Sequence, residues 1–143
     1  MADLRMIERS RPGYSPLAQA YLTQDHRGVM IQREGSIIAM AWSVGNSEQR
    51  TLRTKGYYPL RPGRTLLHAD WVHPDHRGEG LHRVLIAARL ASLTSGTRGM
   101  TIETNIEPGN VASVRNYESQ GFLLDRRLTV MAWGPWAIAR HHG

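Results

Sequence analysis

The hydrophobic pattern of the N-terminal part of the chain is mainly that of β-strands. The stretch VMIQREGSIIAMAWSV, residues 29–44, predicts two strands joined by a tight turn at Glu34-Gly35. Upstream, residues 4–8 predict a short first strand. Residues 45–63 lack clear periodicity and hold several turn formers, so we expect a long loop there.

One helix is predicted between the first strand and the strand pair. Ser15 is expected to be its N-cap, and Pro16 occupies the first helical position, where proline is well tolerated. The helical pattern continues to about His26.

In the second half of the chain, strand patterns alternate with helical ones. RTLLHADWVH, residues 64–73, predicts a strand that ends at His73, because Pro74 disfavours helical geometry in the residue before it. From Gly80 to about Gly96 the apolar residues fall on one stripe, which predicts a helix. The stripe consists of Leu81, Val84, Leu85, Ala88 and Ala91.

The alternation continues to the end of the chain. GMTIETN, residues 99–105, predicts a strand, and Asn110 predicts the N-cap of a second helix that Gly121 ends. FLLDRRLTVMAW, residues 122–133, supplies one or two final strands. This order predicts a mixed α/β sheet with a βαβ crossover between the strands near 66–73 and 99–105.

Composition and length agree with a single globular domain spanning residues 1–143. The chain is 41% hydrophobic and has no cysteine, which excludes a disulfide framework, a thiolate metal site and a thiol nucleophile. The N-terminal MADLRMIERSRPG lacks the apolar core of a signal peptide, and the longest apolar run, IIAMAWSV, is too short to span a bilayer. We therefore expect a cytoplasmic protein with no membrane partner.

The formal net charge of +6 favours anionic partners. Nucleic acid, an acidic protein and a phosphorylated cofactor all satisfy this condition, as does a basic surface that is simply solvated. Arginine supplies nearly all of the positive charge and suits bidentate recognition of phosphate. Charge alone leaves these alternatives open.

A candidate anion site lies in the stretch VHPDHRGEGLHRVLI, which begins at Val72. A helix N-terminus presents unpaired backbone N–H groups and the positive end of the helix dipole. Gly78 and Gly80 would let a phosphate approach the backbone closely, while Arg77 and Arg83 add charge. The spacing fits neither a P-loop nor a Rossmann fingerprint.

Two motifs in this half of the chain resemble those of the GNAT superfamily of acyl-CoA-dependent N-acetyltransferases. Residues 72–82, VHPDHRGEGLH, resemble its V-x-P-x-x-R-G-x-G-x-G/A acetyl-CoA signature, with His82 in the final small position. Residues 110–122, NVASVRNYESQGF, resemble its N-x-x-A-x-x-x-Y-x-x-x-G-F motif. The two motifs are separated by one helix and one strand, as in that family.

The resemblance implies a GNAT-like mixed sheet with a splayed strand pair, flanked by helices, and an acetyl-CoA-dependent N-acetyltransferase. Main-chain groups of Val72, with His73 beside it, would hold the pantetheine arm. Asn110 would touch the cofactor arm, and Tyr117 would protonate the departing thiolate of coenzyme A. Amides of the loop would hold the pyrophosphate, and the loop residues assigned in this way are Arg77, Gly78, Gly80, Leu81 and His82.

The spacing of Asn110 and Tyr117 agrees with a shared ligand. Seven residues on a helix are about 20° short of two full turns, so both side chains can face the same side. Without the upstream motif, Tyr117 would more readily be interpreted as a core aromatic residue beside Val114.

A general base is also expected, because only a free amine attacks a thioester and amines are mostly protonated at neutral pH. Glu103, on the strand that should flank the thioester, is the first candidate. His68 and Asp70 are rivals on the neighbouring strand, where alternation places them on one face with Val72. Water is a further route, and any of the three side chains can instead be structural.

No metal is expected. The stretch HADWVHPDH contains five ligand-type side chains whose spacing fits no metal site, namely His68, Asp70, His73, Asp75 and His76. The terminal Arg140-His141-His142 is expected to be a frayed end.

The sequence does not specify the acceptor, which could be an amine of a small molecule, a peptide or protein, or an RNA-linked aminoacyl group. With no cysteine and no evident Ser/His pair, direct attack by the amine is expected. Two rival functions are a non-catalytic acyl-CoA sensor and a nucleic-acid-binding module built on the basic and aromatic residues of segment 50–64. The oligomeric state, including a homodimer, is left open.

Overall fold

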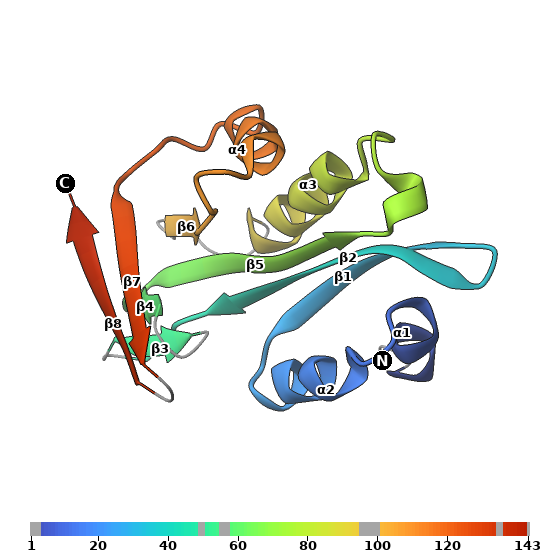
Figure 1. The fold of residues 1–143 in the computed structure, drawn as a ribbon, viewed down its shortest axis with the longest axis horizontal. Coiled ribbons are helices and arrows are strands. Elements are labelled where there is room, and N and C mark those ends of the chain that lie inside the picture. The colour runs from blue at the N-terminus through green and yellow to red at the C-terminus, as the bar shows by residue number, and fades with distance from the viewer. Residues whose placement is uncertain (1–3, 49–50, 55–57, 95–100, 134–135, 143) are drawn as a thin grey trace.

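The computed structural model describes residues 4–48, 51–54, 58–94, 101–133 and 136–142, which form a mixed α/β fold (Figure 1). Its main sheet has the strand order β1-β2-β5-β6. The first two pairings are antiparallel, and β5 and β6 are parallel. These strands are β1 (Arg27–Arg33), β2 (Ser36–Gly45), β5 (Arg64–Val72) and β6 (Thr101–Thr104).

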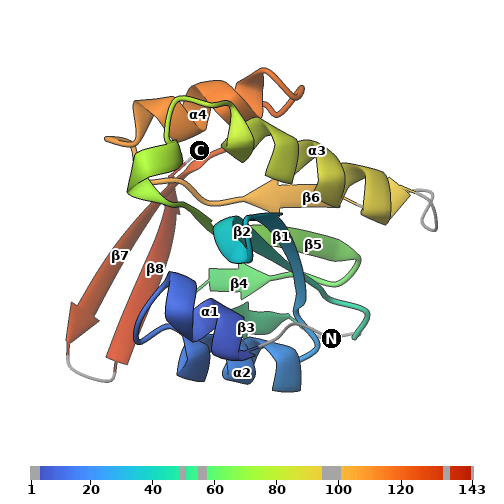
Figure 2. The same ribbon diagram turned by 90° about the vertical axis from the view of Figure 1, so that its right-hand side faces the viewer.

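Helices cover both faces of the main sheet, as the two views in Figures 1 and 2 show. α3 (Leu81–Thr94) and α4 (Val111–Glu118) lie on one face, which we call the α3/α4 face. α1 (Leu4–Ser10) and α2 (Ser15–Thr23) lie on the opposite, α1/α2 face. A 3₁₀ turn (Pro74–His76) connects β5 toward α3.

Two antiparallel hairpins lie near the end of the sheet where β5 begins (Figure 1). One pairs β3 (Leu52–Thr54) with β4 (Tyr58–Leu60), and the other pairs β7 (Arg127–Trp133) with β8 (Trp136–His142). Both hairpins contribute apolar side chains to the cluster around Leu66 of β5.

β2 forms the centre of the core because both of its faces are covered. Every residue from 37 to 44 is buried, which matches the continuous apolar run expected of a sandwiched strand. Trp42 packs with Ile7 of α1 on one face, whereas Ala41 packs with Leu85 of α3 on the other.

The local signals in the sequence are mostly confirmed. Glu34 and Gly35 have φ of 50° and 74°, the two left-handed residues that a tight hairpin turn requires. Asn110 caps α4 by accepting a hydrogen bond from Ser113 N at 3.1 Å, and Gly121 has φ of 87° just beyond the helix. The predicted helix end at Gly96 and strand start at 99–100 lie outside the described residues.

The strand predicted for residues 4–8 is wrong, because these residues belong to α1. Ile7 is fully buried in the core, and its carbonyl accepts a hydrogen bond from Arg11 N at 2.8 Å, which is the spacing of a helical bond. In so short a segment periodicity cannot distinguish strand from helix, and packing against the sheet decides.

The predicted N-cap of α2 is also wrong. Ser15 is the first residue of the helix, and its N–H donates to Glu8 Oε2 at 3.1 Å. Gly13 N donates to the other oxygen of Glu8 at 2.6 Å, so a carboxylate from α1 satisfies the donors at this helix start. Pro16 lies in the first turn, as predicted.

Two expectations of irregular structure are wrong. Segment 45–63 contains β3 and β4, whose three-residue strands are too short to give a period in the sequence. The chain end at 140–142 is not frayed, because it belongs to β8 and pairs with β7 as far as His142.

β5 contains a β-bulge at Ala69, which has a left-handed φ of 53°. The register between β2 and β5 shifts at this point, between Met40 and Trp42. The bulge breaks the alternation of side chains, since His68 contacts Tyr21 on the α1/α2 face while Asp70 contacts α3 and α4. The expectation that His68 shares a face with Asp70 is therefore wrong.

The left-handed backbone at Ala69 can be tested with a β-branched residue. We expect Ala69→Val to lower the free energy of unfolding by more than about 1 kcal/mol, because a branched Cβ is strongly disfavoured at positive φ. Valine would normally be preferred in a strand. Ala69→Gly, which accepts this φ, should lose less. Urea unfolding followed by circular dichroism measures both variants, and a valine variant as stable as the parent would contradict the bulge.

Candidate active site

The parallel strands β5 and β6 separate part-way along β5. Their last paired residues are Leu67 and Thr104, whereas β5 continues beside β2 as far as Val72. The splayed strand pair predicted from the sequence is thereby confirmed. We call the position just beyond Leu67 and Thr104 the strand divergence. Tyr117 of α4 packs on Leu67, so it lies at the divergence on the α3/α4 face.

The second component is the segment 77–82, which we call the glycine loop. Gly78 and Gly80 have φ of 83° and 76°, and a Cβ added at either would meet no atom within 4 Å. Glycine is therefore needed for backbone conformation, and the space beside the loop is open. α3 begins at Leu81, and the amides of Arg83 and Val84 already donate to Gly80 O. The amides of Leu81 and His82 are the ones that this helix start leaves without an intrahelical acceptor. The loop thus offers backbone donors to an anion.

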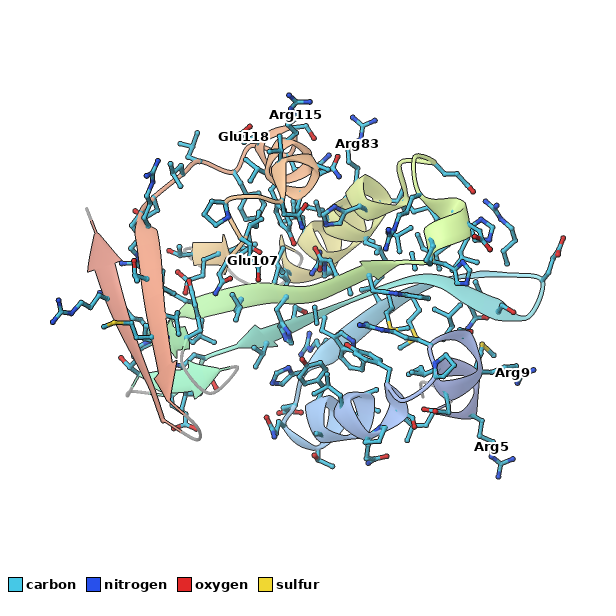
Figure 3. The ribbon with its side chains drawn as sticks, viewed as in Figure 1. Arg5, Arg9, Arg83, Glu107, Arg115 and Glu118 are labelled. Atoms are coloured by element: carbon cyan, nitrogen blue, oxygen red, sulfur yellow. The ribbon has the colours of Figure 1, made fainter. Side chains whose placement is uncertain are left out.

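The glycine loop is attached to the β1–β2 hairpin through Glu79. Arg33 Nη2 donates to Glu79 Oε2 at 2.9 Å, and His76 Nδ1 lies 2.8 Å from Oε1. The hydrogen bond with His76 and that with Arg33 lower the pKa of the Glu79 carboxyl. Its negative charge is compensated by the Arg33 guanidinium, which reduces repulsion of an anion at the loop. Arg83, one turn into α3, projects outward into solvent (Figure 3).

A buried polar cluster joins β5, α3 and α4. Asp70 Oδ2 accepts a hydrogen bond from Tyr117 Oη at 2.6 Å and another from Arg89 Nη2 at 3.0 Å. His82 Nε2 lies 2.7 Å from the same oxygen. Arg89 is fully buried, forms an ion pair with Asp70 Oδ1 at 2.7 Å and donates to the carbonyl of Trp42 at 3.0 Å. We call Asp70, His82, Arg89 and Tyr117 the Asp70 cluster.

His82 occupies the position where the family motif has a small residue, and its side chain is turned away from the loop amides. Besides its bond with Asp70, its Nδ1 lies 3.0 Å from the side-chain nitrogen of Asn116. Because a carboxylate only accepts, the proton of the His82 imidazole must be on Nε2. The imidazole is 16% exposed and fills the space between α3, β5 and α4.

The cluster sets the proton affinities of Tyr117 and Asp70. Burial raises the pKa of the Tyr117 phenol, and the nearby Asp70 carboxylate raises it further. Burial also tends to raise the pKa of Asp70, but the hydrogen bond with His82 and the charge of Arg89 outweigh it and lower that pKa. Tyr117 is therefore a phenol whose proton is directed at a carboxylate.

Glu103, the predicted base, lies on the other side of the sheet from Tyr117. It is paired with Leu66 in the parallel register, and its Oε2 accepts from Arg64 Nη1 at 2.7 Å. Burial and the neighbouring Glu103 raise the pKa of Tyr58 to about 12. The structure thus brings Glu103 and Tyr117 to opposite faces of the sheet, on either side of the divergence.

His68, a rival base, also lies on the α1/α2 face. It is buried, and its Nε2 lies 2.9 Å from His26 Nδ1. Tyr21 stacks on His26 with ring centroids 4.8 Å apart. Burial lowers the pKa of His26, which favours a neutral imidazole. His68 is therefore part of an aromatic cluster with Tyr21 and His26 beneath α2.

The other predicted cofactor contacts are placed around the divergence but stay predictions. Val72 packs with Leu81 against α3, and its main chain pairs with Ala39 on the β2 side. His73 N donates to Ile38 O at 2.8 Å, and its carbonyl accepts from His76 N at 2.9 Å. The main-chain groups of His73 are thus engaged within the protein.

Asn110 and Tyr117 differ in exposure although they lie two turns apart. Asn110 is exposed at the start of α4, and its side-chain oxygen caps the helix. Tyr117 is buried. The exposed amide nitrogen of Asn110 is still available to a ligand, whereas the hydroxyl of Tyr117 is directed into the Asp70 cluster.

Arg89 is the residue that the sequence reasoning missed. It lies on the buried face of α3 with Leu85 and Ile86. The stripe predicted from the sequence is only partly this face, because Val84 and Ala88 are exposed. A buried charge is normally paired, so the burial of Arg89 requires a carboxylate partner, but the predicted stripe gave no signal of it.

Within the parts of the chain that the structure describes, no three His, Asp or Glu side chains are grouped so that they could hold a metal ion. The helices of the same described parts include none that is long and apolar enough to cross a membrane.

Comparisons with known proteins extend these observations. Residues 2–122 match the Acetyltransferase (GNAT) family. No curated protein matches the chain significantly by sequence. The fold is similar to that of the aminoglycoside N-acetyltransferase AAC(6')-Iy in complex with CoA, with a TM-score of 0.66 and 21% identity over 92% of this chain and 96% of that one.

Two further solved structures have the same fold. One is the ribosomal-protein-S18-alanine N-acetyltransferase from Escherichia coli, with a TM-score of 0.60 and 18% identity over 83% of this chain and 70% of that one. The other is the ribosomal-protein-alanine N-acetyltransferase from Brucella melitensis, with a TM-score of 0.55 and 20% identity over 82% of this chain and 62% of that one.

A mixed sheet whose parallel strands diverge beside a glycine loop at a helix start is the architecture of an acyl-CoA-dependent transferase. The family match covers most of the sequence, and the chain belongs to the GNAT acetyltransferase family. It is an acetyl-CoA-dependent N-acetyltransferase, which moves an acetyl group from acetyl-CoA to an amine.

The glycine loop can be tested by substituting Gly80. We expect Gly80→Ala to weaken the binding of coenzyme A about tenfold, because the left-handed conformation costs an alanine roughly 1–2 kcal/mol and the loop amides must shift. Gly63→Ala is the matched control, since Gly63 has φ of 70° with equally open surroundings at the other end of β5. Isothermal calorimetry measures both, and equal affinities would contradict a role for the loop.

Proposed function

We propose that the acceptor is the α-amine of a peptide or protein, and that it attacks the acetyl-CoA thioester directly at the strand divergence. The observation that supports this proposal is the ion pair with Arg64 that engages Glu103, the carboxylate beside the divergence on the α1/α2 face.

The α3/α4 face fits acetyl-CoA. The open glycine loop supplies backbone donors for the diphosphate. The pantetheine arm would run along the part of β5 between the divergence and Val72, which β6 does not pair. Tyr117 lies at the end of this path and would give its proton to the thiol sulfur. When bound, acetyl-CoA supplies an activated acetyl group and a thiol leaving group.

The acceptor would then approach from the α1/α2 face, because the cofactor occupies the other. Glu103 is the described carboxylate nearest in register to the divergence on this face, one residue before Thr104. Its Oε2 is engaged by Arg64 Nη1 at 2.7 Å and is therefore not presented to an incoming amine.

A site whose nearest carboxylate is engaged in an ion pair suits an α-amine better than a lysine side chain. With ordinary pKa values near 7.8 and 10.4, roughly a quarter of an α-amine is unprotonated at pH 7.4, against about one part in a thousand for lysine. An α-amine therefore needs little help to lose its proton, and water can carry that proton away.

Charge also helps to choose between the two kinds of acceptor on which the structural neighbours act, aminoglycosides and ribosomal-protein alanine. Aminoglycosides are polycations, whereas this chain carries a net charge of +6 and pairs both buried carboxylates beside the divergence with arginine, Asp70 with Arg89 and Glu103 with Arg64. Repulsion disfavours a polycation at such a site. Neighbours that act on ribosomal-protein alanine are the better guide to the acceptor.

The two rival functions receive less support. Family membership accounts for the basic charge through a phosphorylated co-substrate and does not favour a nucleic-acid-binding module. A sensor without catalysis would not require Tyr117 at the divergence, where its position supports a role in proton transfer.

The acceptor class can be tested with paired peptides. We expect a lysine-free peptide with a free N-terminus to be acetylated with a kcat/KM roughly 100-fold above that of the same peptide with a blocked N-terminus and one lysine, because of the difference in free amine. Mass spectrometry of the products measures both rates, and an aminoglycoside serves as a third substrate. A preference for lysine or for the aminoglycoside would overturn the α-amine assignment.

Thermal melting provides the control for ligand binding. Acetyl-CoA and coenzyme A should both raise the melting temperature more than ATP does, since only a ligand of the native state stabilises it. The absence of any shift with saturating coenzyme A would overturn the assigned cofactor site.

The acid role of Tyr117 can be tested separately. We expect Tyr117→Phe to lower kcat about 100-fold, the usual contribution of a general acid, while the Kd of coenzyme A changes less than about threefold. Tyr14→Phe is the matched control, because Tyr14 is also buried, with a pKa raised to about 12 by burial, but lies in the core of the α1/α2 face. An unchanged kcat for Tyr117→Phe would remove it from the mechanism.

A further inference from the structure

The Asp70 cluster connects the two parts of the site that the proposed reaction uses, and nothing in the family motif accounts for it. We propose that Asp70 is a positioning residue of this acetyltransferase, which holds the Tyr117 hydroxyl at the strand divergence and ties it through His82 to the glycine loop. This inference rests on the proposed role of Tyr117 as the acid.

A single oxygen makes the connection. Asp70 Oδ2 accepts hydrogen bonds from Tyr117 Oη at 2.6 Å and from His82 Nε2 at 2.7 Å. It therefore joins a residue of α4 to the second residue of α3. His82 is also linked to Asn116, the residue next to Tyr117, at 3.0 Å. The helix that begins at the glycine loop is thus connected to the proposed acid at two points.

Arg89 fixes Asp70 itself. Its guanidinium pairs with both carboxylate oxygens. Its three remaining donors bind the carbonyls of Trp42 at 3.0 Å and Leu85 at 3.3 Å and the hydroxyl of Tyr117 at 3.1 Å. With its fork anchored to β2 and α3, the arginine leaves the carboxylate no alternative orientation. A misplacement of a reacting group by about 1 Å can cost roughly 100-fold in rate, which is the reason such rigidity matters.

The arrangement goes beyond holding two helices together. Packing alone would be served equally well by apolar side chains, because replacing a buried ion pair with apolar residues of similar volume is often neutral or stabilising. Here the carboxylate oxygen accepts a hydrogen bond from the Tyr117 hydroxyl, and the proton in that bond is the one that the proposed mechanism has to move. Asp70 and Arg89 therefore act on Tyr117 with opposite charges, 2.6 Å and 3.1 Å from its hydroxyl oxygen.

These contacts determine where the proton of Tyr117 is held before its transfer. The phenol O–H would turn from Asp70 to the sulfur, so that an O–H bond breaks and an S–H bond forms, and the proton lost by the acceptor amine restores the balance through solvent. Arg89 stabilises the phenolate that is left. The groups that face the phenol are Asp70 from β5, His82 and Arg89 from α3, and Thr104 from β6.

The test is Asp70→Asn, which keeps the shape of the side chain and removes its charge. We expect kcat to fall at least about tenfold, while the Kd of coenzyme A changes less than about threefold. Loss of the negative charge should lower the pKa of Tyr117, so the alkaline limb of the kcat–pH profile should move to lower pH by about one unit or more.

A second readout needs no turnover. The ultraviolet absorbance of phenolate, followed against pH in the unliganded protein, should show a phenol of Asp70→Asn that ionises at lower pH than in the parent. This signal should be missing in the double variant Asp70→Asn/Tyr117→Phe. Asp25→Asn is the matched control, because Asp25 is exposed and its left-handed φ of 64° is tolerated by asparagine.

Several outcomes would overturn the inference. An unchanged kcat for Asp70→Asn would overturn it. A lower kcat without any change in the ionisation of the phenol would also overturn it, because that result is expected if Asp70 has only a structural role. If Asp70→Asn does not fold because Arg89 is left as an unpaired buried charge, Asp70→Asn/Arg89→Met removes both charges. An unchanged kcat in that variant would contradict the proposal.

The proposed function fails in a distinguishable way. If Tyr117→Phe keeps the parent kcat, the acid assignment is lost whatever Asp70→Asn does. If Tyr117→Phe loses kcat while both Asp70 variants keep it, the acid assignment stands and only the positioning role of Asp70 is overturned.

Discussion

Ala69 holds a left-handed backbone in the middle of β5, and the surroundings of the strand differ on the two sides of it. Before it, β5 pairs with β6 as far as Leu67, and after it the strand runs beside β2 alone. The same residue turns the side chain of Asp70 toward the helices, whereas His68 faces α2. The left-handed residue thus lies where the pairing with β6 has ended, and the bulge places the polar cluster on the α3/α4 face.

Arginine compensates the carboxylates around the candidate site. Three pairs connect separate elements: Arg89 of α3 with Asp70 of β5, Arg64 of β5 with Glu103 of β6, and Arg33 of β1 with Glu79 of the glycine loop. The first two are largely buried, and the third is exposed. In each pair the arginine also fixes the geometry of its partner, because its planar fork accepts few orientations. The excess positive charge of the chain is therefore left for solvent and for anionic ligands, and the interior of the site is close to neutral.

The parts of the fold that could be predicted from the sequence are those with local signals. The turn at Glu34-Gly35, the glycine loop and the cap at Asn110 each depend on residues that are adjacent in the chain. The α1 helix and the short strands β3 and β4 could not be predicted, because their few residues take their conformation from packing and pairing.

The candidate site was predictable in part for the same reason. Both family-like motifs are contiguous, and the resemblance that they carry correctly indicated the divergence, whereas the roles of Asn110 and Tyr117 stay predictions. The Asp70 cluster depends on contacts between residues 19 and 47 positions apart, and no residue-type signal marks a left-handed alanine. The face that Glu103 occupies follows from its register with Leu66, which is a property of the assembled sheet.

The pairing of Asp70 with Arg89 also constrains how this sequence can diverge. Losing either partner alone leaves a buried charge uncompensated, which typically costs about 3–5 kcal/mol, whereas exchanging both for apolar residues can be neutral. Descendants of this chain can therefore leave the ion pair only by two coupled substitutions, and the intermediate with one substitution is the least stable form. An evolutionary lineage should accordingly carry both residues or neither.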